Sequence, residues 1–148
     1  MPSALLDTNV LVHAANSSSP LHAAAALLVD EGLRKRNRYC IAPQNLVEFA
    51  AVVTRPRHVQ KPLPVTEAAR MAELMYRSRR LSKIYPRRGT VLRALREGVA
   101  LNVTGPRWYD LFLAVTMRDA GVQVVVTENV LDFQKMPFIT AVKIEDAP

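Results

Sequence analysis

The sequence predicts an α/β domain with a mostly parallel central sheet. Short apolar runs of strand length alternate along the chain with longer segments of helical length. Such alternation is typical of βαβ units, in which a helix carries the chain back so that successive strands run parallel. The length of 148 residues and the hydrophobic fraction of 49% suit one domain with a substantial core. We therefore expect residues 1–148 to form a single domain.

The first elements are predicted from apolar runs and their ends. Residues 3–6 form an apolar run that stops at Asp7, which predicts a buried strand followed by a turn or a helix start. Residues 21–34 are rich in Ala and Leu and predict a helix, and residues 38–42 predict a second strand. Pro43 suits the first turn of a helix that continues over residues 44–53.

Proline and cap residues mark the elements that follow. Prolines between residues 56 and 64 interrupt the helical pattern and predict a surface loop. Thr66 is predicted as the N-cap of a helix that extends to about residue 79. The remaining expected elements are a short strand over 83–85, a helix over 90–100, a helix over 108–119 that ends at Gly121, a strand over 122–126 and a last strand over 142–144.

Composition narrows the class of protein. The net charge is +7, from 20 Lys and Arg against 13 Asp and Glu, and this basic balance favours an anionic partner such as nucleic acid. The single cysteine, Cys40, cannot form an intramolecular disulfide, which fits a cytoplasmic location, and its apolar neighbours predict a buried thiol. The N-terminus resembles no signal peptide, and we expect no membrane-spanning segment.

Three carboxylates stand in apolar surroundings. Asp7 follows a strand, Glu48 lies within an apolar helix, and Asp110 opens another apolar helix. Each has a simpler explanation: Asp7 as a helix cap, Glu48 as the solvent side of its helix, and Asp110 as a partner of the helix dipole. If the three side chains converge instead, they are suited to bind one cation, because unpaired buried carboxylates are costly.

A fourth polar group follows the predicted strand 122–126. It contains Thr127, Glu128, Asn129 and Asp132 and would emerge at the same sheet edge as Asp7. Several oxygen ligands at one edge suit a hard cation, Mg²⁺ or Mn²⁺. The three histidines, His13, His22 and His58, have no spacing typical of a zinc site.

Four segments together resemble the PIN-domain ribonucleases, and among them the VapC-type toxins of bacterial toxin–antitoxin pairs. They are residues 5–10 (LLDTNV), 47–49 (VEF), 109–114 (YDLFLA) and 126–133 (VTENVLDF). The resemblance spans nearly the whole chain. It implies a three-layer α/β/α sandwich, cleavage of RNA with Mg²⁺ or Mn²⁺, a homodimer and a small antitoxin partner.

The resemblance also implies roles for individual residues. The catalytic set is Asp7, Glu48, Asp110 and Asp132, and the metal ligands are Asp7, Glu48, Asp110 and Asn129. Many relatives carry Asp where this chain has Asn129, so either Glu128 or Asp132 carries the fourth charge, or Asn129 is a neutral ligand. The supporting residues near the metal are Thr8, Asn9, Thr127 and Glu128.

A basic segment accompanies these carboxylates. Between residues 77 and 96 the chain has no Asp or Glu, which predicts contact with RNA or with the antitoxin, or else a solvated basic face. Its cations are Arg77, Arg79, Arg80, Lys83, Arg87, Arg88, Arg93 and Arg96.

Two other functions remain open at this stage. A phosphohydrolase of the haloacid dehalogenase type would use Asp7 as nucleophile, but it would carry a second Asp two residues later, where this chain has Asn9. An inactive module that binds RNA or protein would share the fold without the chemistry. Metal-dependent cleavage of RNA by the purified protein distinguishes the three.

Overall fold

The sheet has five strands, and all neighbouring pairs are parallel. The computed structural model describes residues 1–57 and 59–148, so His58, one of the three histidines considered above, lies outside the described residues. The strands run in the spatial order β3-β2-β1-β4-β5. Their bounds are β1 Ala4–Leu6, β2 Tyr39–Ile41, β3 Ser82–Lys83, β4 Val124–Val126 and β5 Thr140–Val142.

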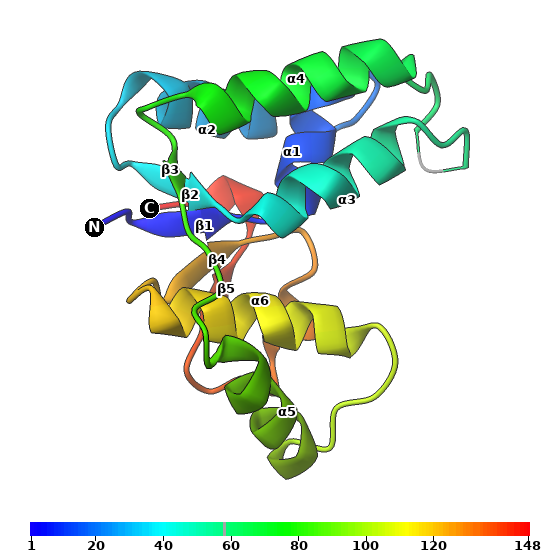
Figure 1. Cartoon of the computed structure of the whole chain (residues 1–148). Helices are drawn as coiled ribbons and strands as arrows, with labels where there is room; N and C mark the ends of the chain where they lie inside the picture. The colour runs from blue at the N-terminus through cyan, green and yellow to red at the C-terminus, as the bar shows by residue number, and fades with distance from the viewer. Residues whose placement is uncertain (58) are drawn as a thin grey trace.

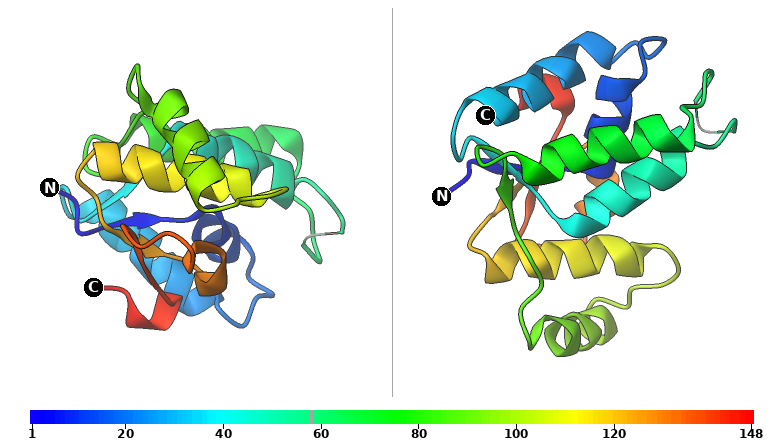
Figure 2. Two further views of the ribbon diagram at one scale, coloured as in Figure 1. Left: turned by 90° about the horizontal axis from the view of Figure 1, so that it is seen from below. Right: turned by 45° about the horizontal axis from the view of Figure 1, so that its top comes forward.

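Helices cover both faces of this sheet, which confirms the expected three-layer α/β/α sandwich (Figures 1 and 2). On one face lie α1 Thr8–Ala15, α2 His22–Arg34, α3 Pro43–Val53 and α4 Val65–Arg77. On the other face α6 Arg107–Asp119 packs against the sheet, and α5 Thr90–Ala100 packs against α6. Two short 3₁₀ helices, η1 Val130–Phe133 and η2 Ile144–Asp146, complete the fold.

The strands divide the apolar residues between two cores, one on each face. In β1, Ala4 and Leu6 belong to the core under α1–α4, whereas Leu5 belongs to the core under α6. This division follows from the two-residue period of a strand, because successive side chains point to opposite faces. Cys40 of β2 is buried in the second core, as expected, and burial raises the pKa of its thiol to about 12.

Several predicted boundaries were wrong. The helix expected after an N-cap at Thr66 begins at Val65, with Pro64 as N-cap, and it ends at Arg77. A proline suits this place because its carbonyl accepts from the N–H groups of Glu67 and Ala68, while no helical hydrogen bond needs its missing N–H.

The last strand also differs from the expected range 142–144. It covers Thr140–Val142, because β5 pairs with β4 and β4 ends at Val126, the partner of Val142. The third strand is shorter and earlier than expected, at Ser82–Lys83. The predicted stop of α6 is confirmed, because Gly121 adopts a positive φ of 77° just after the helix.

The strand order has a consequence for binding. From β1 the chain moves outward through β2 and β3, and it then returns to the other side of β1 to form β4 and β5. The crevice beyond the carboxyl ends of β1 and β4 is therefore a topological switch point, the usual binding place in open α/β sheets. Within residues 1–57 and 59–148, none of the helices combines the length and apolar character needed to cross a membrane.

Candidate functional site

A pocket of about 320 Å³ opens at this switch point, beside α1, α3 and the first turn of α6. We call it the acidic pocket, because five of its side chains are carboxylates. It is lined by Asp7, Thr8, Asn9, Val12, His13, Glu48, Val52, Asp110, Glu128, Asn129 and Asp132. The structure thus brings all four predicted acidic or polar segments to one place.

Asp7 is the most buried carboxylate of the pocket, with 9% of the residue exposed. It lies between β1 and α1 and caps that helix, because its Oδ1 accepts from the Thr8 N–H (2.8 Å). Its Oδ2 accepts from the Thr127 hydroxyl (2.8 Å). Burial raises the pKa of Asp7 to about 6, the two hydrogen bonds oppose that rise, and the charges of Asp110 and Glu48 add to it. Asp7 is therefore both a helix cap and part of the pocket.

Glu48 points into the pocket and does not mark the solvent side of α3. Its neighbour Val47 is exposed instead, with 72% of its surface accessible. The Glu48 carboxylate accepts from the Thr8 hydroxyl (2.8 Å) and from Gln44 Nε2 (2.9 Å). Thr8 in turn accepts from the buried Asn45 side chain (3.2 Å), so polar residues of α1 and α3 hold Glu48 in place.

Asp110 lies in the first turn of α6 and shares a cation with Asp132. Arg107 donates to Asp110 through Nη1 (3.0 Å) and contacts Asp132 through Nη2 (2.8 Å). Burial is the main cause that raises the pKa of Asp110; Arg107 opposes the rise, and the charges of Asp132 and Glu48 add to it. Sequence reasoning missed Arg107. The available signal was its place at the start of a helix, where a cation opposes the helix dipole unless an anion compensates it.

The turn after β4 ties the two central strands together. The Thr127 hydroxyl, which donates to Asp7, also accepts from the Asn129 N–H (3.1 Å) and from Asn9 Nδ2 (3.1 Å). Asn9 Oδ1 accepts from the Glu128 N–H (3.0 Å). This network fixes the backbone of residues 127–129 against the start of α1.

His13 lines the pocket, and sequence reasoning missed its role. It lies on α1, its Nε2 is 2.7 Å from Glu128 Oε2, and its Nδ1 is 2.6 Å from the Ser19 hydroxyl. Nothing in the sequence pairs His13 with Glu128, because the contact depends on how α1 lies beside the turn after β4.

The pocket chemistry suits a hard divalent cation. Its polar lining offers carboxylate, amide and hydroxyl oxygens, the donors that Mg²⁺ and Mn²⁺ prefer. Burial is the main cause of the raised pKa of Asp7, and a bound cation would offset the cost of burying its charge. In their present conformations no three His, Cys, Asp or Glu side chains among the described residues lie close enough to hold one ion. The carboxylates are bound to neighbours instead, and the ligand set therefore stays a prediction.

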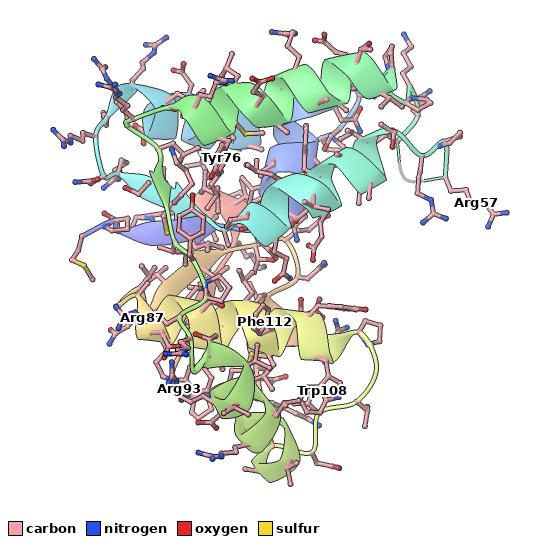
Figure 3. The ribbon with its side chains drawn as sticks, viewed as in Figure 1. Arg57, Tyr76, Arg87, Arg93, Trp108 and Phe112 are labelled. Atoms are coloured by element: carbon pink, nitrogen blue, oxygen red, sulfur yellow. The ribbon has the colours of Figure 1, made fainter. Side chains whose placement is uncertain are left out.

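The basic segment lies apart from the pocket, and none of its eight predicted side chains lines it. Figure 3 shows Arg87 and Arg93 near the C-terminal end of α6, away from Trp108 at its start. Some of these cations are engaged within the protein: Arg77 pairs with Glu73 (2.6 Å), and Arg93 pairs with Asp119. Contact with RNA or with an antitoxin remains a prediction for this segment.

Comparison with known proteins extends these observations. The sequence profile of the PIN domain family matches residues 4–139. Ribonuclease VapC24 of Mycobacterium tuberculosis is 30% identical over 135 residues, which is 90% of this chain and 90% of that protein. DNA-bound VapBC from Salmonella typhimurium has a TM-score of 0.67 at 20% identity over 97% of this chain and 99% of that chain. A toxin–antitoxin complex from Klebsiella pneumoniae has a TM-score of 0.62 at 15% identity over 96% and 98%. Both structures share the fold described above.

Proposed function

The chain belongs to the PIN domain family and is a homologue of the VapC ribonucleases, and from this premise we propose that it is a metal-dependent endoribonuclease and the toxin of a toxin–antitoxin pair. The observation that carries the proposal is the acidic pocket, where Asp7, Glu48 and Asp110 line one cavity at the switch point of the sheet. These residues come from α3, α6 and the end of β1, and the fold brings them to the wall of one cavity.

Some pocket residues would bind the metal ion, and others orient these ligands. Asp7, Glu48 and Asp110 would hold Mg²⁺ or Mn²⁺, with Asn129 or a carboxylate of its turn completing the ligands. A divalent ion supplies a more acidic water and compensates the charge that develops on the phosphate. Thr8 and Thr127 orient Glu48 and Asp7, because each hydroxyl donates to one of these carboxylates.

The structure offers less support for the phosphohydrolase alternative. That reaction would need a second carboxylate two residues after Asp7, and this position is Asn9. Asn9 is engaged on both sides of its amide, with Thr127 and with the Glu128 N–H. Its place therefore supports a role in holding the turn after β4.

Two surfaces support the proposed protein partners. An apolar groove of about 270 Å³ lies between α1, α2 and α4, and we propose that an apolar segment of the antitoxin occupies it. Helix α5 exposes Val91, Leu92, Leu95 and Val99, an apolar face that we assign to the homodimer contact. We propose that the RNA substrate enters the acidic pocket through its solvent-facing opening.

The deciding experiment compares Asp7→Asn with the wild type. The substitution keeps the size of the side chain but removes its charge, so we expect kcat/KM for RNA cleavage in Mg²⁺ or Mn²⁺ to fall by at least about 100-fold. Asp146→Asn, an exposed change far along the chain, is the matched control and should retain full activity. Equal cleavage by Asp7→Asn and wild type would refute this mechanism. Wild-type protein that binds RNA without cleaving it would support the inactive module instead.

A further inference from the structure

We propose that His13 is a positioning residue for the acidic pocket: it holds the Glu128 carboxylate at the pocket wall, where Glu128 supplies the negative charge that Asn129 lacks. The inference rests on the proposed function, because it concerns the cation that the pocket would bind. It assigns the fourth charge of the site, for which sequence reasoning left Glu128, Asn129 and Asp132 open.

Both ring nitrogens of His13 have a partner, so the imidazole has a defined orientation. An ionised carboxylate can only accept, and therefore His13 Nε2 donates to Glu128 Oε2 across 2.7 Å. On the other side, Nδ1 lies 2.6 Å from the Ser19 hydroxyl. That hydroxyl is itself placed by the Leu21 N–H, which donates to it (3.0 Å). A chain of contacts thus runs from the loop after α1 through His13 to Glu128.

Two side chains of helix α1 form hydrogen bonds with Glu128. Asn9 and His13 are four residues apart on this helix, and side chains at that spacing share one face. Asn9 Oδ1 accepts from the backbone N–H of Glu128, and His13 donates to its carboxylate. Both contacts lie beside Asp7, because Thr127 joins Asp7 to the same turn.

The other two candidates in this turn are less suited to supply the fourth negative charge of the pocket. Asn129 is neutral, and Asp132 is paired with Arg107 at 2.8 Å. Glu128 has no Arg or Lys partner among the described residues, and its side chain is 45% exposed against 18% for His13. An exposed glutamate samples many rotamers, so a fixed partner is needed to keep its carboxylate at the pocket. His13 provides that constraint, in the way that outer hydrogen bonds orient metal ligands.

The test measures binding of Mn²⁺ alone to the full chain by isothermal titration calorimetry, with RNA cleavage as a second readout. His13→Leu removes the contact and should weaken Mn²⁺ binding by about tenfold, as is typical for loss of an outer-shell partner. His13→Gln keeps an N–H donor that reaches Glu128 and should stay within about threefold of wild type. His22→Leu is the matched control, since the His22 ring hydrogen-bonds the backbone carbonyl of His13 and does not line the pocket, and Mn²⁺ affinity should be unchanged.

A double-mutant cycle separates positioning from a merely structural role. Glu128→Gln should weaken Mn²⁺ binding as much as His13→Leu does, and the double variant should be no weaker than either single variant. Unchanged affinity in His13→Leu, or losses that add in the double variant, would overturn the proposal. If His13→Leu fails to fold, then Glu128→Gln and His13→Gln still decide it. Wild-type protein that binds Mn²⁺ with this pattern but leaves RNA intact would contradict the proposed function alone, whereas absence of Mn²⁺ binding would contradict both.

Discussion

Asp7 shows how one residue serves both fold and site. Its carboxylate caps α1, and burial of that carboxylate raises its pKa from 3.8 to about 6. Between these two values the folded protein keeps a proton that the unfolded chain releases. Protonated Asp7 therefore contributes fully to the free energy of unfolding below about pH 4. That contribution is lost as the pH rises through about 6, because the buried carboxylate then ionises.

This sign leads to a prediction for the metal-free protein. Asp7→Asn abolishes the titration, so in EDTA the variant should lose less stability than wild type between pH 4 and pH 7. The difference in the free energy of unfolding should reach about 1–3 kcal/mol at pH 7, in favour of the variant, because one pKa unit corresponds to about 1.4 kcal/mol. Urea unfolding at several pH values measures it, with Asp146→Asn as control. If the free energy of unfolding depends on pH in the same way for Asp7→Asn and wild type, then ionisation of buried Asp7 does not destabilise the protein.

The sequence identified the pocket carboxylates better than their partners. Asp7, Glu48 and Asp110 stand out because an isolated carboxylate in an apolar stretch requires an explanation. Arg107 and His13 do not stand out, because charged and polar residues are ordinary on a surface. Their roles depend on contacts with Asp132 and Glu128, which lie 25 or more residues away along the chain.

Among the elements, helices were predicted more closely than strands. The range 90–100 was expected as a helix and is α5, Thr90–Ala100, because the helical period of its apolar residues is a local signal. Strands of two or three residues carry little local signal, and their ends are set by the neighbouring strand. The bounds of β3 and β5 therefore needed the pairing with β2 and β4.

The contact between α5 and α6 depends on a glycine. A Cβ atom at Gly98 would lie 2.2 Å from Cη2 of Trp108, so the two helices approach closely only because this residue lacks a side chain. Trp108 packs against Gly98 and against the core under α6.

We therefore expect Gly98→Ala to destabilise the protein, although alanine is the better helix former. The added methyl group must displace the Trp108 ring, and overpacking of this kind costs about 1–3 kcal/mol. Arg96→Ala, at an exposed position of the same helix outside the apolar face, is the control and should change stability by less than about 0.5 kcal/mol. Thermal unfolding and Trp fluorescence report the effect, and a more stable Gly98→Ala protein would contradict the packing argument.

At the scale of the whole molecule, the site is a product of strand order. Local patterns predicted parallel strands, but they could not say that β1 lies between β2 and β4. This order places the end of β4 beside the end of β1, so that Thr127 reaches Asp7 across 120 positions of sequence. From the sequence, the carboxylates were expected to share one pocket only if the strands before them end at the same edge of the sheet. The strand order meets this condition.

The distribution of charge leads to the last prediction, because the basic segment and the acidic pocket occupy different parts of the molecule. Arg87 and Arg88 are exposed, and RNA that follows both regions would release counterions at these cations. In an Asp7→Asn background, replacing both arginines by Ala should flatten the dependence of log affinity on log salt concentration by roughly one to two units. Replacing the exposed Arg34 and Arg36 by Ala removes the same charge elsewhere and should leave that slope nearly unchanged. RNA binding measured at several salt concentrations compares the two pairs. If the Arg87 and Arg88 variant keeps the parent slope while its affinity for the antitoxin falls, the segment is a protein-docking surface and RNA takes another path to the pocket.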